Sequence, residues 1–388
     1  MEQNSKWQHQ PRWNGEFSWT NTLFLLATPV AGIALFPVYL LSSEFAWSDL
    51  AIFTFMLLAS GFSITAGYHR LFAHQTYESP ALVRFFFLVF GAAAMQNSAF
   101  KWCSDHRYHH RFVDKEGDPY SISKGFFYAH MGWIFRNDPK DRSFANAADL
   151  EADPLVRWQH RHFLLIAFAV SFGLPTLLGW MIGRPFAGFF VGGLLRLIVV
   201  HHGTFFINSL AHMFGTRPYS TKVSARDCWW LAFLTNGEGY HNFHHAFAND
   251  YRNGVRWYQW DPSKWLILCL NFVGLSRNLS RTPDAHILKA KLETSSDQFI
   301  QNWREEVPAQ VEAMRLAIEQ HLQDFQRKLR EFQAWRETMI REGKRSHRAR
   351  ARHWAGRLRA ERKMLERSLN EYRWMIRQLQ HGGLSALG

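Results

Sequence analysis

Long apolar segments are the feature that most limits how this 388-residue chain can fold. Four runs, at about residues 23–41, 50–68, 163–183 and 186–210, contain almost no charged side chains. Because an α-helix rises about 1.5 Å per residue, each run is long enough to cross a hydrocarbon core of roughly 30 Å. Short connections join the first run to the second and the third to the fourth. We therefore predict an all-α, multi-pass membrane domain in which four transmembrane helices form two hairpins.

The distribution of basic residues predicts how this domain is oriented. The segment between the second and third runs is rich in lysine and arginine, whereas the two hairpin connections contain only Arg184. By the positive-inside rule, that segment and both chain termini are cytoplasmic. A polar segment, residues 1–20, precedes the first run without a small-residue cleavage pattern after it, so we predict a retained helix rather than a signal peptide. A further apolar segment from Ala81 contains Arg84 and suits an interfacial or half-buried helix.

Histidine is the metal-binding residue type that stands out, with 20 copies against three scattered cysteines. Two copies of the pattern H-x-x-H-H occur, in "DHRYHH" and "GEGYHNFHH", and their histidines at i, i+3 and i+4 share one helical face. On the predicted topology, nine histidines converge on the cytoplasmic face: His69, His74, His106, His109, His110, His212, His241, His244 and His245. A structural zinc ion needs about four ligands and favours cysteine. Imidazole-rich sites suit iron, copper or zinc, and two redox-active ions use this many nitrogens.

The fourth apolar run also carries a polar stripe. His201, Thr204, Asn208 and His212 recur every three or four residues on a helix that we predict to lie in lipid. Polar groups at such depth are usually functional or paired with one another. One face of this helix is therefore expected to contribute to a site inside the protein.

Five segments together resemble one known protein family. They are "GYHRLFAH", "DHRYHH", "GFFYAHMGW", "NSLAHMFGTRPY" and "NGEGYHNFHHAFANDY", in this order along the chain. Their residues and separations are similar to those of the integral-membrane fatty-acyl desaturases, the stearoyl-CoA desaturase-like family with three histidine boxes. The resemblance extends from about Phe17 to Arg281. It implies a four-helix membrane domain with a cytoplasmic helical cap that holds a di-iron site.

The resemblance also implies roles for individual residues. One iron would be held by four histidines, with Asn208 reaching it through water: His69, His110, His241 and His245. The other iron would be held by the remaining five: His74, His106, His109, His212 and His244. Three further residues match positions around the bend of the acyl channel: Gln96, Trp102 and Thr204. The implied cofactors are two iron ions, with O₂ as co-substrate.

The activity implied by the resemblance is O₂-dependent insertion of a cis double bond, at the Δ9 position, into a saturated fatty-acyl chain. Two alternatives stay open on the residues alone. One is a related membrane di-iron hydroxylase, such as an alkane or lipid monooxygenase. The other is a membrane scaffold whose histidines store or carry metal, with the helical tail as its working part.

The partners follow from the same resemblance. The residue before Asp105 is basic in the animal acyl-CoA enzymes but is Ser104 here, so the acyl carrier stays open between CoA, a lipid and a carrier protein. The chain contains no His-Pro-Gly-Gly haem motif. We therefore expect a separate electron donor of the ferredoxin, rubredoxin or cytochrome b5 type, with its reductase. Membrane lipid is a further partner, and a bacterial protein of this kind would lie in the inner membrane.

The C-terminal part of the chain differs in composition from the rest. We divide the chain into a cytoplasmic segment (1–20), a membrane desaturase domain (21–284) and a basic helical extension (285–388). Two series of apolar residues, from Val311 and from Leu358, step by threes and fours and predict a helical hairpin with a break near Gly343. The open roles are packing within its own domain, self-association, donor docking and contact with anionic lipid. Nucleic acid is not an expected partner, although the net charge is +13.

Overall fold

The computed structural model describes residues 15–42, 44–139, 142–302, 309–341 and 348–382. Within these residues the chain is helical, and strand pairing is limited to isolated β-bridges. The predicted all-α class is therefore confirmed. Two compact units are present. The first joins Met1–Thr216 to Val223–Arg281, and the second joins Arg217–Lys222 to Thr282–Gly388.

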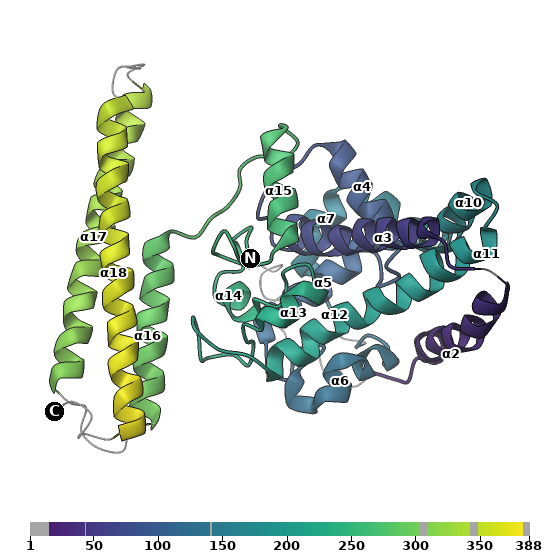
Figure 1. The fold of residues 1–388 in the computed structure, drawn as a ribbon, viewed down its shortest axis with the longest axis horizontal. Coiled ribbons are helices and arrows are strands. Elements are labelled where there is room, and N and C mark those ends of the chain that lie inside the picture. The colour runs from purple at the N-terminus through teal and green to yellow at the C-terminus, as the bar shows by residue number, and fades with distance from the viewer. Residues whose placement is uncertain (1–14, 43, 140–141, 303–308, 342–347, 383–388) are drawn as a thin grey trace. The chain divides into compact units, whose positions relative to one another are not determined.

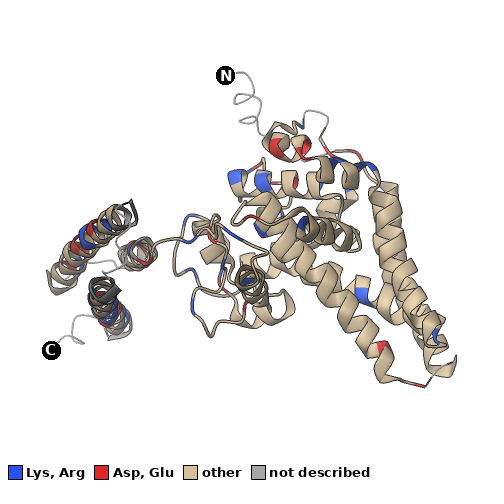
Figure 2. Ribbon diagram, turned by 90° about the horizontal axis from the view of Figure 1, so that it is seen from above, with Lys and Arg blue, Asp and Glu red and all other residues tan. Residues whose placement is uncertain are grey.

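The first unit contains the four predicted membrane helices. They span Trp19–Ser42, Trp47–Ala73, Phe163–Met181 and Pro185–Met213, and each is long and apolar enough to cross a membrane. The second and fourth helices continue for several residues beyond the predicted spans, because the backbone stays helical after the apolar composition ends. Figure 2 shows how few lysine, arginine, aspartate and glutamate residues these helices carry.

Three stretches of the membrane helices are wound as wider π-helix. The second span is α3 (Trp47–Phe62) followed by the π-helix η1 (Ser63–Ala73). The third is α9 (Phe163–Phe168), the π-helix η5 (Ala169–Gly173) and α10 (Leu174–Met181), and the fourth is α11 (Pro185–Ala187), the π-helix η6 (Gly188–Leu195) and α12 (Arg196–Met213). Short π-helical stretches in other proteins frequently lie at functional sites.

The first span is a single α-helix, α2 (Trp19–Ser42). Shorter helices lie between and after the four spans along the chain. The apolar segment at Ala81 forms α4 (Ala81–Ala92), which is too short to be counted among the candidate membrane spans. The others are α5 (Ala99–Phe112), η2 (Ile122–Lys124), α6 (Phe126–His130), η3 (Gly132–Phe135), η4 (Ala145–Ala147), α7 (Ala148–Ala152), α8 (Pro154–Arg161), α13 (Trp229–Leu234), α14 (His241–Ala246) and α15 (Pro262–Phe272). Figure 1 shows their order along the chain.

The second unit is a bundle of three helices, α16 (Asp284–Asn302), α17 (Ala309–Arg341) and α18 (Arg348–Gly382) (Figure 1). The two predicted apolar series pack against each other and against α16, with Leu365 and Tyr372 almost completely buried. The predicted helical hairpin is therefore present, and its predicted break near Gly343 lies outside the described residues. The sequence analysis missed α16 because its weakly periodic sequence follows the membrane domain directly.

The bundle core supports a stability prediction. We expect Leu365→Ala to lower the free energy of unfolding of the bundle by about 2–5 kcal/mol, because it removes a buried side chain and leaves a cavity. Denaturant unfolding followed by circular dichroism measures the change. The neighbouring Met364 is 47% exposed, so Met364→Ala is the matched control and should cost much less. Equal losses in the two variants would contradict this packing.

Candidate metal centre

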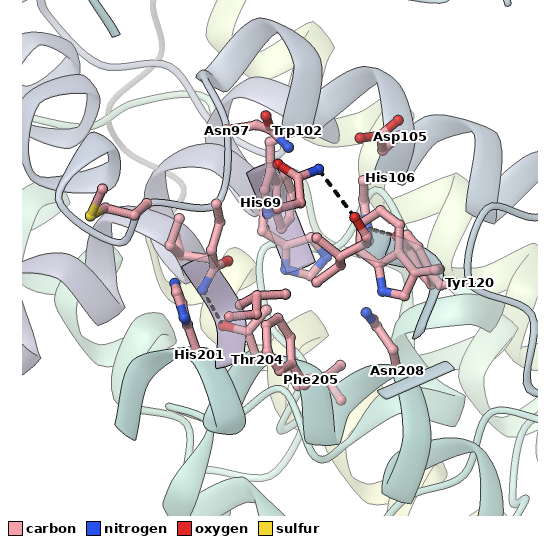
Figure 3. A pocket seen from close by; sticks show the side chains of 18 of the residues that line it. His69, Asn97, Trp102, Asp105, His106, Tyr120, His201, Thr204, Phe205 and Asn208 are labelled. Atoms are coloured by element: carbon pink, nitrogen blue, oxygen red, sulfur yellow. Dashed lines mark hydrogen bonds between the residues drawn. The ribbon is translucent and has the colours of Figure 1, made fainter. Parts of the chain in front are cut away.

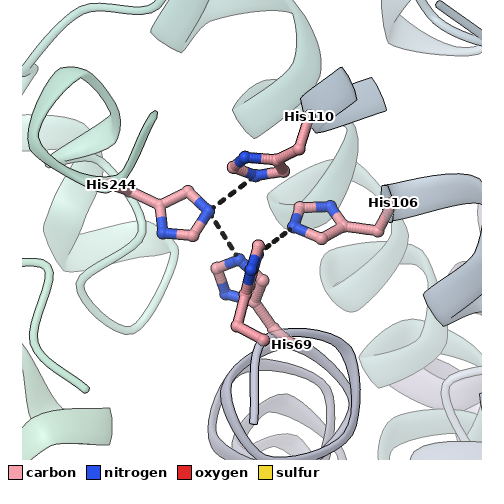
Figure 4. A group of neighbouring side chains, drawn as sticks. His69, His106, His110 and His244 are labelled. Carbon is pink, nitrogen blue, oxygen red and sulfur yellow. Dashed lines mark hydrogen bonds between the residues drawn. The ribbon is translucent and has the colours of Figure 1, made fainter. Parts of the chain in front are cut away.

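All nine predicted histidine ligands lie together in the first unit. They come from four elements: η1 and the residue after it, helix α5, the end of α12, and α14. Their ligand atoms form two groups, in each of which all atoms lie within 4.8 Å of one another. One group is His69, His74, His106, His110 and His244, and the other is His109, His212, His241 and His245. Figure 4 shows rings of the first group pointing toward one another.

The π-helix η1 explains how His69 and His74 reach the same group. Residues five apart point about 140° away from each other on an α-helix, but they lie about one turn apart on a π-helix. The backbone N–H of His74 donates to the carbonyl oxygen of His69, 3.1 Å away, which is the i→i+5 bond of this winding. The extra residue in the turn therefore aligns the two rings.

The nine histidines are divided between the two groups differently from the prediction. In each H-x-x-H-H segment the i and i+4 residues share one group, as His106 with His110 and His241 with His245. The i+3 residues, His109 and His244, belong to the opposite group. On a helix, i+4 lies about 40° from i on one side and i+3 about 60° on the other. The two segments therefore each contribute to both groups, and this grouping of the side chains differs from the predicted assignment of individual histidines to the two irons.

The Nε2 atoms crowd one another in a way that calls for a cation. His244 Nε2 lies 3.0 Å from His69 Nε2 and 2.9 Å from His110 Nε2. In the second group, His241 Nε2 lies 3.1 Å from both His212 Nε2 and His245 Nε2. A neutral imidazole nitrogen offers either one proton or one lone pair. Three such atoms cannot all be satisfied by each other, whereas a metal ion would accept every lone pair.

The outer ring nitrogens fix which atom carries the lone pair. His69 Nδ1 donates to Glu238 Oε2 at 2.9 Å, and His109 Nδ1 donates to Asp118 Oδ1 at 2.9 Å. His212 Nδ1 lies 2.7 Å from the hydroxyl of Ser224. These bonds place the proton on Nδ1 and direct the lone pair of Nε2 inward. The donor set therefore fits a metal site with oriented ligands.

The remaining rings are held in the neutral form by their surroundings. Burial, reinforced by the neighbouring imidazoles, keeps the pKa of His106, His244 and His245 well below the usual value for histidine. The pKa is lowered in the same way, first of all by burial, for His74, His110 and His241. Neutral imidazole is the form that binds metal.

Asp118 supports a prediction about metal affinity. Because it holds His109 through Nδ1 and is itself fully buried, Asp118→Asn is expected to weaken metal binding by roughly 10-fold to 100-fold. Metal retained per chain after dialysis against graded chelator concentrations measures this loss. Asp324→Asn on the surface of α17 is the control for the same chemical change and should retain wild-type metal content. Unchanged retention in Asp118→Asn would contradict the assignment.

A buried network of charges holds Glu238 in turn. Arg70 donates from its guanidinium to Glu238 Oε1 and to Asp261 Oδ1, both at 2.9 Å. Asn253 donates to Glu238 Oε2 at 2.6 Å. Burial opposes ionisation of Glu238, but His69 and Arg70 outweigh it, so the pKa of this carboxyl is lowered. Glu238 therefore stays ionised and can accept the hydrogen bond from the Nδ1–H group of His69.

Gly237 allows this network to close. Its φ is +99°, in the region that favours glycine, and a Cβ there would lie 2.5 Å from Asp261 Oδ1. The sequence analysis named neither Glu238 nor Arg70, although each is adjacent or close to a predicted ligand. A carboxylate three residues before His241 was the available signal, but its partners come from distant parts of the chain.

A cavity of about 420 Å³ lies beside the histidines; most of its surface is apolar, and polar side chains make up about half of the residues that line it. The predicted substrate residues Gln96, Trp102 and Thr204 all line it, and so does Asn208 (Figure 3). Gln96 Nε2 donates to Thr204 Oγ1 at 3.0 Å. The Trp102 ring stacks on His106 with ring centres 5.1 Å apart. An elongated apolar ligand in this cavity would therefore lie directly against the histidine groups.

Comparisons with known proteins agree with this geometry. Residues 45–267 match the sequence family described as fatty acid desaturase. The chain is 40% identical over 300 residues to a probable acyl-CoA desaturase of Schizosaccharomyces pombe, which covers 76% of this chain and 62% of the relative. It is 39% identical over 274 residues to acyl-CoA desaturase 1 of Saccharomyces cerevisiae, which covers 69% of this chain and 53% of the relative.

A bacterial relative is matched over more of its own length. The sn-1 stearoyl-lipid 9-desaturase of Anabaena variabilis is 32% identical over 267 residues, which is 68% of this chain and 94% of the relative. The matched parts thus span less than two thirds of each of the two yeast proteins but nearly the whole of the Anabaena protein. With four helices apolar and long enough to span a membrane, three of them inside the matched region, the protein is an integral membrane protein, and the chain belongs to the fatty acid desaturase family.

Proposed function

We propose that this protein is an O₂-dependent fatty-acyl desaturase that inserts a cis double bond at the Δ9 position of a saturated chain. The observation that carries the proposal is the position of two groups of inward-facing histidine Nε2 atoms against an apolar cavity. The names of the relatives, acyl-CoA desaturase and stearoyl-lipid 9-desaturase, support the reaction class and the position.

The residues of the cavity would bind the acyl chain and fix its place. All methylene groups have nearly the same reactivity, so the position of the double bond has to come from the shape of the cavity. Trp102 and the Gln96–Thr204 pair form walls next to His106, where one methylene would be held. The apolar lining also excludes water from the place of reaction.

The histidines fit two iron ions, one held by each group. Asn208 lines the cavity beside them and would reach one iron through a water molecule. Two iron ions bound here would supply the oxidising power, drawn from O₂, that removal of hydrogen from an unactivated methylene requires. Glu238, Asp118 and Ser224 would keep the ligand rings oriented while the charge of the centre changes.

The partners proposed for this activity follow from its chemistry. The substrate is a fatty-acyl chain carried by CoA, by a lipid or by a carrier protein, and the names of the relatives include acyl-CoA and acyl-lipid enzymes. Electrons would come from a separate donor protein. The basic segment between the second and third spans supports, by the positive-inside rule, a cytoplasmic position for the metal centre and both termini.

Expression in a host that lacks its own desaturase, together with a compatible electron donor, tests the proposal. We expect new cis-monounsaturated fatty acids with the double bond at C9, and none in a matched His241→Ala variant. Hydroxylated fatty acids would instead identify a hydroxylase. A protein that carries stoichiometric iron but forms no new product would overturn the proposal and favour a metal-storing scaffold.

A further inference from the structure

Arg196 is a completely buried arginine inside the fourth membrane span. It begins α12, directly after the π-helix η6. A charged side chain in the interior of a membrane domain is costly and usually has a function. The mechanism proposed above makes no use of it, and it does not line the cavity.

The guanidinium of Arg196 is bound by neutral oxygen atoms from three elements. Nη1 donates to the carbonyl oxygen of Ala93 at 2.9 Å, and Nη2 donates to the hydroxyl and the carbonyl of Ser171 at 2.8 and 3.1 Å. Nε donates to Gly192 O at 3.2 Å. Among the residues that the structure describes, no carboxylate forms an ion pair with it.

The oxygen atoms that bind Arg196 lie at the end of a helix or in π-helical turns. Ala93 caps the C-terminus of α4, where the helix dipole favours a cation, and Ser171 and Gly192 lie in the π-helices η5 and η6. Arg196 thus joins the end of α4 to the third and fourth spans. Its role is to hold these elements together at one point.

The segment that follows Ala93 is a strained turn on the wall of the cavity. Met95 and Asn97 have φ values of +52° and +79°, which non-glycine residues rarely adopt. Met95, Gln96 and Asn97 all line the cavity. Strained backbone of this kind persists only where surrounding contacts fix it.

Helix α12 supplies contacts along the whole turn. Arg196 binds the carbonyl of Ala93, and His201 Nε2 donates to the carbonyl of Ala94 at 2.9 Å. Thr204 then accepts the hydrogen bond from the side chain of Gln96. Three side chains of one helix therefore determine where the turn and Gln96 lie relative to His106; Figure 3 shows two of them, His201 and Thr204, at the wall of the cavity.

We propose that Arg196 is a positioning residue that sets the position of the double bond. It anchors the start of the 93–97 turn, and so determines how far along the cavity the Gln96–Thr204 pair meets the acyl chain. This inference rests on the proposed desaturase function. Loosening the anchor should let the chain bind in more than one register, because one methylene changes binding in an apolar pocket only modestly.

The test is the positional profile of the products formed by Arg196→Lys, which keeps the charge but loses the forked donors. We expect the share of double bonds displaced from the wild-type position to rise by about tenfold, with iron content per chain unchanged. Hydrogen exchange measured by mass spectrometry should be faster in residues 93–97. Ser171→Ala removes one acceptor of Arg196 and should shift the product profile in the same direction. This second variant provides the test if Arg196→Lys does not fold.

Arg184→Lys is the matched control, because Arg184 binds Asp49 through two nitrogen atoms at 2.8 and 2.7 Å in the same membrane unit but outside the cavity. Its profile should equal that of the wild type. Folded variants at 196 and 171 with wild-type profiles and exchange rates would overturn the inference while leaving the desaturase proposal intact. A wild-type protein that forms no unsaturated product would remove both.

Discussion

A His244→Ala variant should form less than about 1% of the product of the wild-type protein and should lose iron from the first histidine group. His244 Nε2 lies between His69 and His110, so the substitution removes the ligand that the other rings surround. Loss of an outer partner of a metal ligand typically costs 10-fold to 100-fold in affinity or activity, and loss of the ligand itself should exceed ~100-fold.

Fatty-acid profiles and iron content per chain, determined on the same preparations, measure this effect. Because His321 is an exposed histidine on α17 in the bundle, His321→Ala is the control for removing an imidazole elsewhere. It should retain the iron content and product level of the wild type. If His244→Ala kept both its iron and its product, the assignment of the first group would be wrong.

An Arg70→Met variant should be destabilised by about 3–5 kcal/mol, because Glu238 and Asp261 would be left buried without their cation. The side chain of Arg70 is 1% exposed, and those of its partners are 3% and 0% exposed. His69 would also lose the fixed carboxylate that orients it, so the variant should bind iron more weakly. Thermal or denaturant unfolding in detergent, with and without iron, measures both effects.

The charge origin of this loss can be separated from the loss of packing. Adding Glu238→Gln and Asp261→Asn to Arg70→Met removes the uncompensated charges and should restore part of the stability. The exposed pair Arg277–Glu78 provides the control, and Arg277→Met should cost much less stability than Arg70→Met because water screens an exposed ion pair. A triple variant less stable than Arg70→Met would show that the buried charges are not the cause.

The membrane helices were predictable from sequence because lipid selects long apolar runs, which composition shows directly. The membership of the nine histidines in one centre was also predictable, because the two H-x-x-H-H patterns and the topology bring them to one face. Their division into two groups was not. It depends on the helical rotation of α5 and α14 relative to each other, which spacing alone does not contain.

The residues that support the centre were not predictable for a related reason. Glu238 and Arg70 act through contacts with residues distant in sequence, and Glu238 is 168 positions from Arg70. Asp118 is only nine positions from His109, but the turn that brings the two side chains together is not marked by any pattern in the sequence. The π-helices η1, η5 and η6 were missed as well, because neither composition nor hydrophobic spacing distinguishes a π-helical stretch from the α-helix around it. The alignment of His74 with His69 by the wider turn, and the contacts of Arg196 with Ser171 and Gly192 in π-helices, are seen only once the backbone is known.

The wide separation of the ligands along the chain has a consequence for biosynthesis. His69 and His244 are 175 residues apart, so at roughly 5–20 residues per second the ribosome needs about 10–35 s to pass from one to the other. The third and fourth spans are synthesised within that interval, before α14. The complete ligand set therefore exists only near the end of translation of the membrane unit, and tight iron loading is a late event in the maturation of the protein.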